Sequence, residues 1–218
     1  NIHKKMSAIL NYAVTYYNLP SNPCHKAGTM GKTTRSMSFW TLEQYNRFIE
    51  CVEDIRVHAA FQTLFYSGMR CGELLALTLS DLDFKSSTIS INKTLYHRNR
   101  EKISTSPKTD NSIRTISMPD AVMQEVQAYT SRLYGIQPQD RVFGFTDMPL
   151  RKNMARYSEK ASIPRIRIHD LRHSHVSLLI NMGFTPQLIA ERIGDTVQMV
   201  NSVYGHLYPS KHEEVADR

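Results

Sequence analysis

The sequence predicts a mainly helical α+β domain with one small antiparallel sheet of about three strands. Apolar residues recur at helical spacing through most of the 218-residue chain. Residues 81–118 differ: they are rich in Thr, Ser and Ile, and they alternate in STISINKTL and SIRTISM as half-buried strands do. Hydrophobic residues make up 41% of the chain, and no apolar stretch is long enough to cross a bilayer. The composition therefore argues against a disordered protein and against a membrane-spanning one.

The first expected helix covers 2–18, where apolar side chains share one helical face before Pro20 and Pro23 end the helix. From 25 to 39 the chain is rich in Gly, Thr, Ser, Lys and Arg, which indicates an exposed basic linker. A new unit begins at Thr41, because T-L-E-Q matches a capping box, in which the Thr and Gln side chains satisfy free backbone N–H groups.

The remaining helices are expected on either side of the strand-like region. Before it they are 42–54, 57–68 and the short patch GELLAL. After it they are 119–133, 149–160, 169–182, 185–193, 196–204 and a short last helix at 209–217. The sheet is therefore expected as a basic insertion within a helical domain.

Positive charge is concentrated in two parts of the chain. The net charge is +7, and such an excess favours an anionic partner, most often nucleic acid. Residues 93–114 hold six Lys or Arg against two acids, and residues 151–175 hold seven against two. Both stretches contain or flank the motifs described below.

Three cysteines, Cys24, Cys51 and Cys71, are spread widely and form no CxxC pair. This number and spacing give no disulfide framework and no cysteine metal site. Incidental or buried thiols in a reducing cytoplasm are the favoured interpretation.

Four short segments, in order along the chain, carry residues suited to phosphate chemistry: SGMRCGELLAL, SPKTDNSIRTISMP, IHDLRHSH and ERIGDTVQMVNSVYGHLYP. Their order and spacing resemble the tyrosine recombinase (phage integrase) family over about 40–209. YGHLYPSK is similar to integrases of phages and conjugative transposons of Gram-positive bacteria. The resemblance implies a tyrosine-recombinase-like catalytic domain with a C-terminal tail at 40–218. It also implies that 1–24 is the C-terminal helix of a truncated core-binding domain, joined by the linker at 25–39.

The same resemblance implies a function. It predicts a site-specific recombinase or integrase of a mobile element that cleaves and rejoins DNA through a 3′-phosphotyrosyl intermediate on Tyr204. The family's chemistry needs no metal, ATP or other cofactor. The implied partners are double-stranded DNA at attachment sites, further copies that form a tetramer on DNA, and accessory DNA-bending or directionality proteins. No membrane partner is expected.

Two arginines match the family's phosphate clamp. Attack on a phosphodiester builds negative charge on its non-bridging oxygens, and a guanidinium offers paired N–H donors to them. Arg70 in SGMR and Arg172 in HDLR match these roles. Arg70 taken alone fits a surface arginine paired with Glu73 at i+3, a pairing that would also hold Arg70 in place as an accessory contact. His169 matches the family histidine that hydrogen-bonds the phosphate and accepts the tyrosine proton.

The departing 5′ oxygen of the DNA needs a proton, and the resemblance assigns that proton to a lysine. Lys108 in SPKT, at an expected hairpin tip, matches the family's hairpin lysine. Lys93 and Lys102 compete for this assignment because they lie in the same basic region.

Tyr204 matches the nucleophile because it lies nine residues after Asp195, the family's spacing between its second motif histidine and the tyrosine. Tyr208 is a nearby rival. The family usually has His or Trp where this chain has Asp195, and an ionised carboxylate would repel the phosphate. Either Asp195 is protonated, or it turns away and orients a neighbour, or another donor such as His206 replaces it.

Three alternative functions follow from the same residues. A type IB topoisomerase would use the same chemistry but reseal the same strand. A DNA-binding relative with impaired catalysis would explain Asp195. A metal-dependent hydrolase could use His169 and His173, which have the i,i+4 spacing of a zinc helix, but Arg172 would repel the metal and no Glu stands in the HExxH place. We favour His173 as a satisfied, partly buried histidine.

Overall fold

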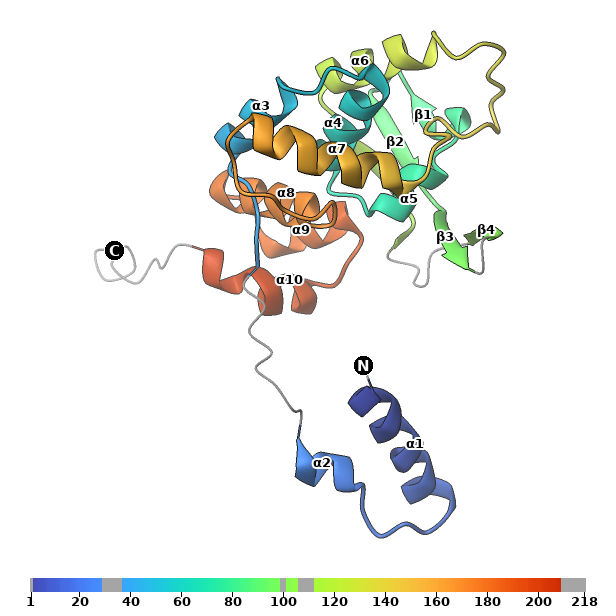
Figure 1. Ribbon diagram of the computed structural model, residues 1–218, viewed down its shortest axis with the longest axis vertical. Coiled ribbons are helices and arrows are strands. Elements are labelled where there is room, and N and C mark those ends of the chain that lie inside the picture. Colours follow the sequence, from blue (N-terminus) through green and yellow to red (C-terminus); the bar gives the residue numbers. More distant parts are fainter. Residues whose placement is uncertain (1, 29–36, 99–100, 106–111, 209–218) are drawn as a thin grey trace, which may run out of the picture. The chain divides into compact units, whose positions relative to one another are not determined.

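The computed structural model describes residues 2–28, 37–98, 101–105 and 112–208, with the backbone alone for 96–98 and 101–105. The chain divides into two compact units, 1–36 and 37–218 (Figure 1). In the described residues no helix is both long enough and apolar enough to cross a membrane.

The first unit holds two helices, α1 (Ile2–Tyr16) and α2 (Pro23–Ala27). The helix expected at 2–18 is confirmed with an end two residues earlier. Helix α2 was missed because five residues are too few for an apolar period. Its signal is Asn22 before Pro23: the Asn22 side chain accepts a hydrogen bond from the backbone of Cys24 (2.9 Å) and donates one to Asn11 of α1 (2.7 Å).

The second unit is built around α4 (Ile55–Ser67), which is buried along most of its length and contacts several other helices. Tyr45 and Phe65 stack in this core with their ring centroids 3.6 Å apart. The predicted capping box is present, with Thr41 and Gln44 each accepting from the other's backbone. The helices that surround α4 are α3 (Leu42–Ile49), α5 (Cys71–Ala76), α6 (Asp120–Thr130), α7 (Asp147–Lys160) and α8 (Asp170–Asn181).

The predicted three-stranded antiparallel sheet is present in the order β1 (Leu82–Asp83), β2 (Thr88–Ile91), β5 (Arg114–Ser117). Ile89 pairs with Ile116, and both are buried on the face toward the helices. The strands β3 (Thr94–Arg98) and β4 (Glu101–Thr105) form a separate two-stranded hairpin rather than part of one sheet. This hairpin lies against α5 at Gly72, where a Cβ would come 2.7 Å from Thr94 Oγ1.

The last three α-helices of the described residues place several site residues: α8, α9 (Pro186–Ile193) and α10 (Val197–Tyr204). They share a small apolar cluster that includes Val176, Ile189, Val200 and the ring of Tyr204. Figure 1 shows these orange and red helices together on one side of α4 and α7. A short 3-10 turn, Gly205–Leu207, follows α10. The helix expected at 209–217 lies outside the described residues.

Candidate active site

A pocket of about 220 Å³ brings together residues from distant parts of the second unit. Four of the predicted catalytic residues line it: Arg70, His169, Arg172 and Tyr204. We call this cavity the basic pocket. Its other lining residues are His173, Ile193, Asp195, Met199 and Val203.

The turn SGMR sets the position of Arg70 between α4 and α5. Gly68 ends α4 in the left-handed conformation, with φ of 65°, which strains any residue that has a side chain. A Cβ there would also come 2.5 Å from His175 Cδ2 on α8. Gly68 therefore permits both the turn and the close approach of α8, and so brings Arg70 near the motif of Arg172.

Arg70 is held by Glu73 from the first turn of α5. Its Nη1 donates to Glu73 Oε1 (3.0 Å), while its backbone N–H donates to Glu73 Oε2 (2.9 Å). Glu73 is almost fully buried and also accepts from Arg114 Nη2 (2.9 Å). Burial opposes ionisation of Glu73, but the charges and hydrogen bonds of Arg114 and Arg70 keep its pKa below the ordinary value. The i+3 pairing considered from the sequence is thus present, and it fixes Arg70 at the basic pocket.

Arg172 lies on α8 with only 4% of its surface exposed. Its Nη1 donates to two backbone carbonyls, Gly68 O (2.9 Å) and Ile193 O (2.8 Å). Burial and the nearby Arg70 charge lower its pKa to about 10, which leaves the guanidinium charged at neutral pH. The two carbonyls fix the plane of the guanidinium and aim Nη2 into the pocket.

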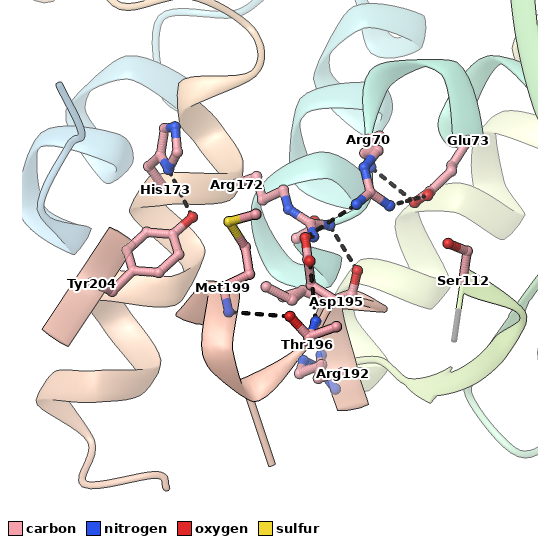
Figure 2. Close-up of polar contacts among 12 residues, drawn as sticks. Arg70, Glu73, Ser112, Arg172, His173, Arg192, Asp195, Thr196, Met199 and Tyr204 are labelled. Atoms are coloured by element: carbon pink, nitrogen blue, oxygen red, sulfur yellow. Dashed lines mark hydrogen bonds and ion pairs between the residues drawn. The ribbon is translucent and has the colours of Figure 1, made fainter. Parts of the chain in front are cut away.

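Asp195 faces both arginines. A single oxygen, Oδ2, accepts from Arg70 Nη2 (3.2 Å) and from Arg172 Nη2 (3.1 Å), as Figure 2 shows. The other oxygen accepts from the backbone N–H of Thr196 (3.1 Å). Asp195 therefore does not turn away from the arginines. His206 lies in the 3-10 turn after α10, is exposed and is not among the residues that line the basic pocket.

Tyr204 is the last residue of α10, and its hydroxyl points at α8 rather than at solvent. The hydroxyl hydrogen-bonds Nδ1 of His173 across 2.7 Å (Figure 2). Burial raises the pKa of Tyr204 to about 12, although the charge of Arg172 acts in the opposite direction. A phenol in this state is a poor nucleophile until a base removes its proton.

His173 is the site residue whose role sequence reasoning missed. It is partly buried and hydrogen-bonded, as expected. Its partner is Tyr204, 31 positions away, so no local sequence pattern predicts the contact. Burial, followed by the neighbouring His169, lowers the pKa of His173 to about 4. His169 lies at the start of α8, with its ring edge-on to that of His173 at 5.3 Å. Burial and then Arg172 lower the pKa of His169 as well.

The remaining predicted residues lie elsewhere. Lys108 is outside the described residues, and of Lys102 the structure describes the backbone alone. Lys93 is paired with the buried carboxylate of Asp81. Tyr208 packs on the apolar cluster of α8, α9 and α10 and is not part of the pocket lining. In the described ranges, no group of three or more His, Cys, Asp or Glu side chains could hold a metal ion.

The chain is similar to known proteins in sequence and in fold. A profile of the phage integrase family matches residues 38–211. The ICEBs1 integrase of Bacillus subtilis (strain 168) is 34% identical over 234 residues, covering 100% of this chain and 64% of that protein's length. The integrase of Staphylococcus phage L54a is 28% identical over 254 residues, and the match covers 98% of this chain and 71% of that integrase. The fold is similar to that of the Tn1549 transposon integrase in complex with a circular intermediate DNA, with a TM-score of 0.82 and 20% sequence identity. The structural match covers 100% of this chain and 76% of that integrase chain.

Proposed function

Because this chain belongs to the phage integrase family, we propose that it acts as a site-specific DNA recombinase with Tyr204 as its nucleophile. One observation carries the proposal. The hydroxyl of Tyr204 lies in the same pocket as two guanidiniums, and those guanidiniums converge on a single anionic oxygen. A nucleophile beside a site for an oxyanion is the minimum that phosphoryl transfer by an enzyme side chain requires.

The two arginines serve as the phosphate clamp. Asp195 Oδ2 marks a point where Arg70 and Arg172 donate together, and a non-bridging phosphate oxygen at this point would receive the same two hydrogen bonds. Donors fixed before the reaction stabilise the charge that develops in the transition state. Glu73 holds Arg70 in place, and two backbone carbonyls hold Arg172 in place. Loss of either donor is expected to slow cleavage by about 10²–10³-fold.

The proposed reaction consists of two transesterifications. Tyr204 Oη attacks the scissile phosphorus, the bond to the 5′ oxygen breaks, and a 3′-phosphotyrosyl link and a free 5′-hydroxyl result. A 5′-hydroxyl from another strand then attacks this link and releases Tyr204. The phosphoester bond is kept in the covalent intermediate and the charge is carried by arginines, so these steps need neither ATP nor a metal. Family resemblance assigns the proton for the leaving 5′ oxygen to Lys108.

Double-stranded DNA is the proposed partner. Helix α7 presents Arg151, Lys152 and Arg156 at or near the surface, within the basic stretch 151–175. Each basic pocket holds one Tyr204, so exchange of four strands between two duplexes calls for four copies, and we propose a tetramer on DNA. Accessory DNA-bending or directionality proteins, and action in the bacterial cytoplasm, remain part of the proposal on family grounds.

Covalent trapping tests the function. A pool of nicked duplexes of randomised sequence would be incubated with the protein, because a nick beside the cleavage point lets the short fragment that carries the new 5′-hydroxyl diffuse away and the adduct accumulate. We expect an adduct that survives denaturant, forms in the presence of a metal chelator and disappears in Tyr204→Phe. The matched control Tyr208→Phe should keep it. An adduct retained by Tyr204→Phe would overturn the assignment. A Holliday-junction assay separates strand exchange from the resealing expected of a topoisomerase.

A further inference from the structure

The contact between Tyr204 and His173 gives a side chain outside the expected catalytic set a direct place in the reaction. The distance from Tyr204 Oη to His173 Nδ1 is 2.7 Å, and the His173 side chain is 16% exposed. His169, to which family resemblance gives the tyrosine proton, lies one helical turn earlier with its ring against the edge of His173. Among the described residues, the imidazole bonded to the hydroxyl is therefore that of His173.

The far edge of the His173 ring faces a fixed negative charge. His173 Nε2 lies 3.9 Å from Asp170 Oδ1 on the preceding turn of α8. Asp170 is itself held in place, since Oδ2 accepts from the backbone of Arg167 (2.8 Å) and Oδ1 accepts from Arg167 Nη2 (2.7 Å). Burial opposes ionisation of Asp170, but these bonds to Arg167 keep its pKa below the ordinary value. A carboxylate on this edge favours the tautomer with its proton on Nε2, which leaves Nδ1 free to accept.

We propose that His173 is the catalytic base that takes the proton of Tyr204, with Asp170 as a positioning residue on its far side. The role rests on the proposed nucleophile. As the bond from Tyr204 Oη to phosphorus forms, the O–H bond breaks and the proton moves to His173 Nδ1, while the bond to the 5′ oxygen breaks and that oxygen takes a proton from the general acid, the role that family resemblance gives to Lys108. In the second step the incoming 5′-hydroxyl returns its proton to that general acid and displaces the phenolate, and the phenolate recovers the proton from His173 Nδ1. His169 then serves as a phosphate contact beside Arg172.

Before the reaction the proton lies on Tyr204 and His173 is uncharged, so the transfer starts from a neutral pair and must be driven by formation of the bond to phosphorus. Burial holds the pKa of His173 at about 4, so at neutral pH the ring is uncharged and able to accept a proton. Burial also raises the pKa of Tyr204 to about 12, so the phenol needs a base before it can attack. The charge of the imidazolium formed during transfer is offset by Asp170.

The test combines His173 variants with a phenol of altered acidity. His173→Ala and His173→Gln should slow adduct formation on a nicked duplex by about 10²–10⁴-fold, with DNA binding and thermal stability little changed. Added imidazole should restore part of the rate of His173→Ala. Fluorinated tyrosine at position 204, which ionises more readily, should shrink the loss caused by His173→Gln. The matched variant His169→Ala should slow the reaction by a factor that fluorination leaves unchanged.

Two results would overturn this role. One is an unchanged rate in the His173 variants. The other is a reduced rate that neither imidazole nor fluorination alters, which would indicate a structural role alone. Failure of the proposed function would give a different result. Neither the unaltered protein nor any His173 variant would then form an adduct with any member of the duplex pool.

An independent observation concerns Asp195. Its Oδ2 accepts from Nη2 of Arg70 and from Nη2 of Arg172, and its side chain is only 24% exposed. A phosphate at the same point would meet a like charge and would find both donors engaged. We infer that Asp195 is a resident anion that competes with phosphate, so that the pocket opens to DNA only when this carboxylate leaves the arginines. This inference also rests on the proposed phosphate clamp.

Inorganic phosphate tests the competition without any DNA cleavage. By isothermal titration, Asp195→Asn should bind inorganic phosphate about tenfold more tightly than the unaltered protein, because a neutral amide competes less for the two guanidiniums. Asp147→Asn is the matched control: it makes the same change of charge in a pair with Arg151 on α7 and should leave phosphate affinity unchanged. Equal affinity in Asp195→Asn and the unaltered protein would overturn the inference, whether or not adducts form.

Discussion

Arg114 of β5 and Glu73 of α5 form a buried ion pair next to Arg70 of the basic pocket, with Arg114 Nη2 donating to Glu73 Oε2 across 2.9 Å. The exposed fractions of the two side chains are 6% and 3%. Arg114 also donates to the backbone carbonyl of Arg192 (2.8 Å), at the end of α9. One buried arginine thus joins the sheet, the helix α5 that follows Arg70 and the helix α9 that precedes Asp195.

Loss of Arg114 should destabilise the fold and the site together. Arg114→Ala leaves the buried Glu73 with fewer partners, and such broken pairs cost about 3–5 kcal/mol in the free energy of unfolding. Arg114→Lys should cost less, since it restores charge without the planar fork. Urea denaturation measures the effect. Arg151→Ala, which removes the exposed pair of Arg151 with Asp147, should change stability little. Equal effects of Arg114→Ala and Arg151→Ala would contradict this account.

Gly68→Ala should damage the pocket by a clash as well as by backbone strain. Gly68 has φ of 65°, and a Cβ there meets His175 Cδ2 at 2.5 Å. Gly183 offers a control, because its φ is 84° and nothing lies within 4 Å of its Cβ position. Thermal unfolding should show a loss of about 1–2 kcal/mol for Gly183→Ala and a clearly larger loss for Gly68→Ala. Equal losses of stability in the two variants would mean that the packing of α8 does not depend on its close approach to Gly68.

Acid should destabilise the protein through His175. Burial, and then the charges of Arg192 and Arg172, lower its pKa to about 3. The folded protein keeps this histidine neutral, whereas the unfolded chain protonates it below about pH 6.5. The unfolded state therefore binds more protons as the pH falls from about 6.5 toward 3, and this residue alone removes about 1.4 kcal/mol of stability per pH unit. Urea denaturation between pH 7 and pH 4 should show a shallower slope for His175→Gln; an identical slope would exclude this origin.

DNA binding should depend strongly on salt. Each phosphate contacted by a lysine or arginine contributes about −0.9 to the slope of log K against log salt for duplex DNA. Replacing Arg151, Lys152 and Arg156 with Ala should weaken binding and make that slope less negative. Fluorescence anisotropy with a labelled duplex at several salt concentrations measures both. Glu159→Ala, an acidic residue of the same helix, should not weaken binding. A slope near zero for the unaltered protein would exclude an electrostatic interface.

Much of the site could be predicted because its parts lie in short motifs. SGMR and HDLR each contain a local requirement, a left-handed turn at Gly68 and a buried helix carrying Arg172, and local requirements are visible in a sequence. The contact of His173 with Tyr204 could not be predicted, because it depends on how α8 packs against α10. The same holds for Arg114, whose partners lie on α5 and α9.

In the fold, too, local features could be predicted and features that depend on packing could not. Strand alternation predicted the sheet, but the separation of β3 and β4 into their own hairpin depends on packing against α5, which alternation does not encode.

The contacts of Asp195 could not be predicted either. Its replacement of a usual His or Trp is visible in the sequence, but its bonds to Arg70 and Arg172 come from the packing of α5, α8 and the end of α9.

During catalysis Tyr204 is expected to become covalently joined to a DNA 3′ phosphate. Mass spectrometry of the adduct trapped on a nicked duplex, after digestion of the protein and the DNA, identifies the residue and the end that are linked. We predict a nucleotide on Tyr204 attached through its 3′ phosphate, with a free 5′-hydroxyl on the released strand. Modification of Tyr208 or of any other residue, or a link to a 5′ phosphate, would contradict it.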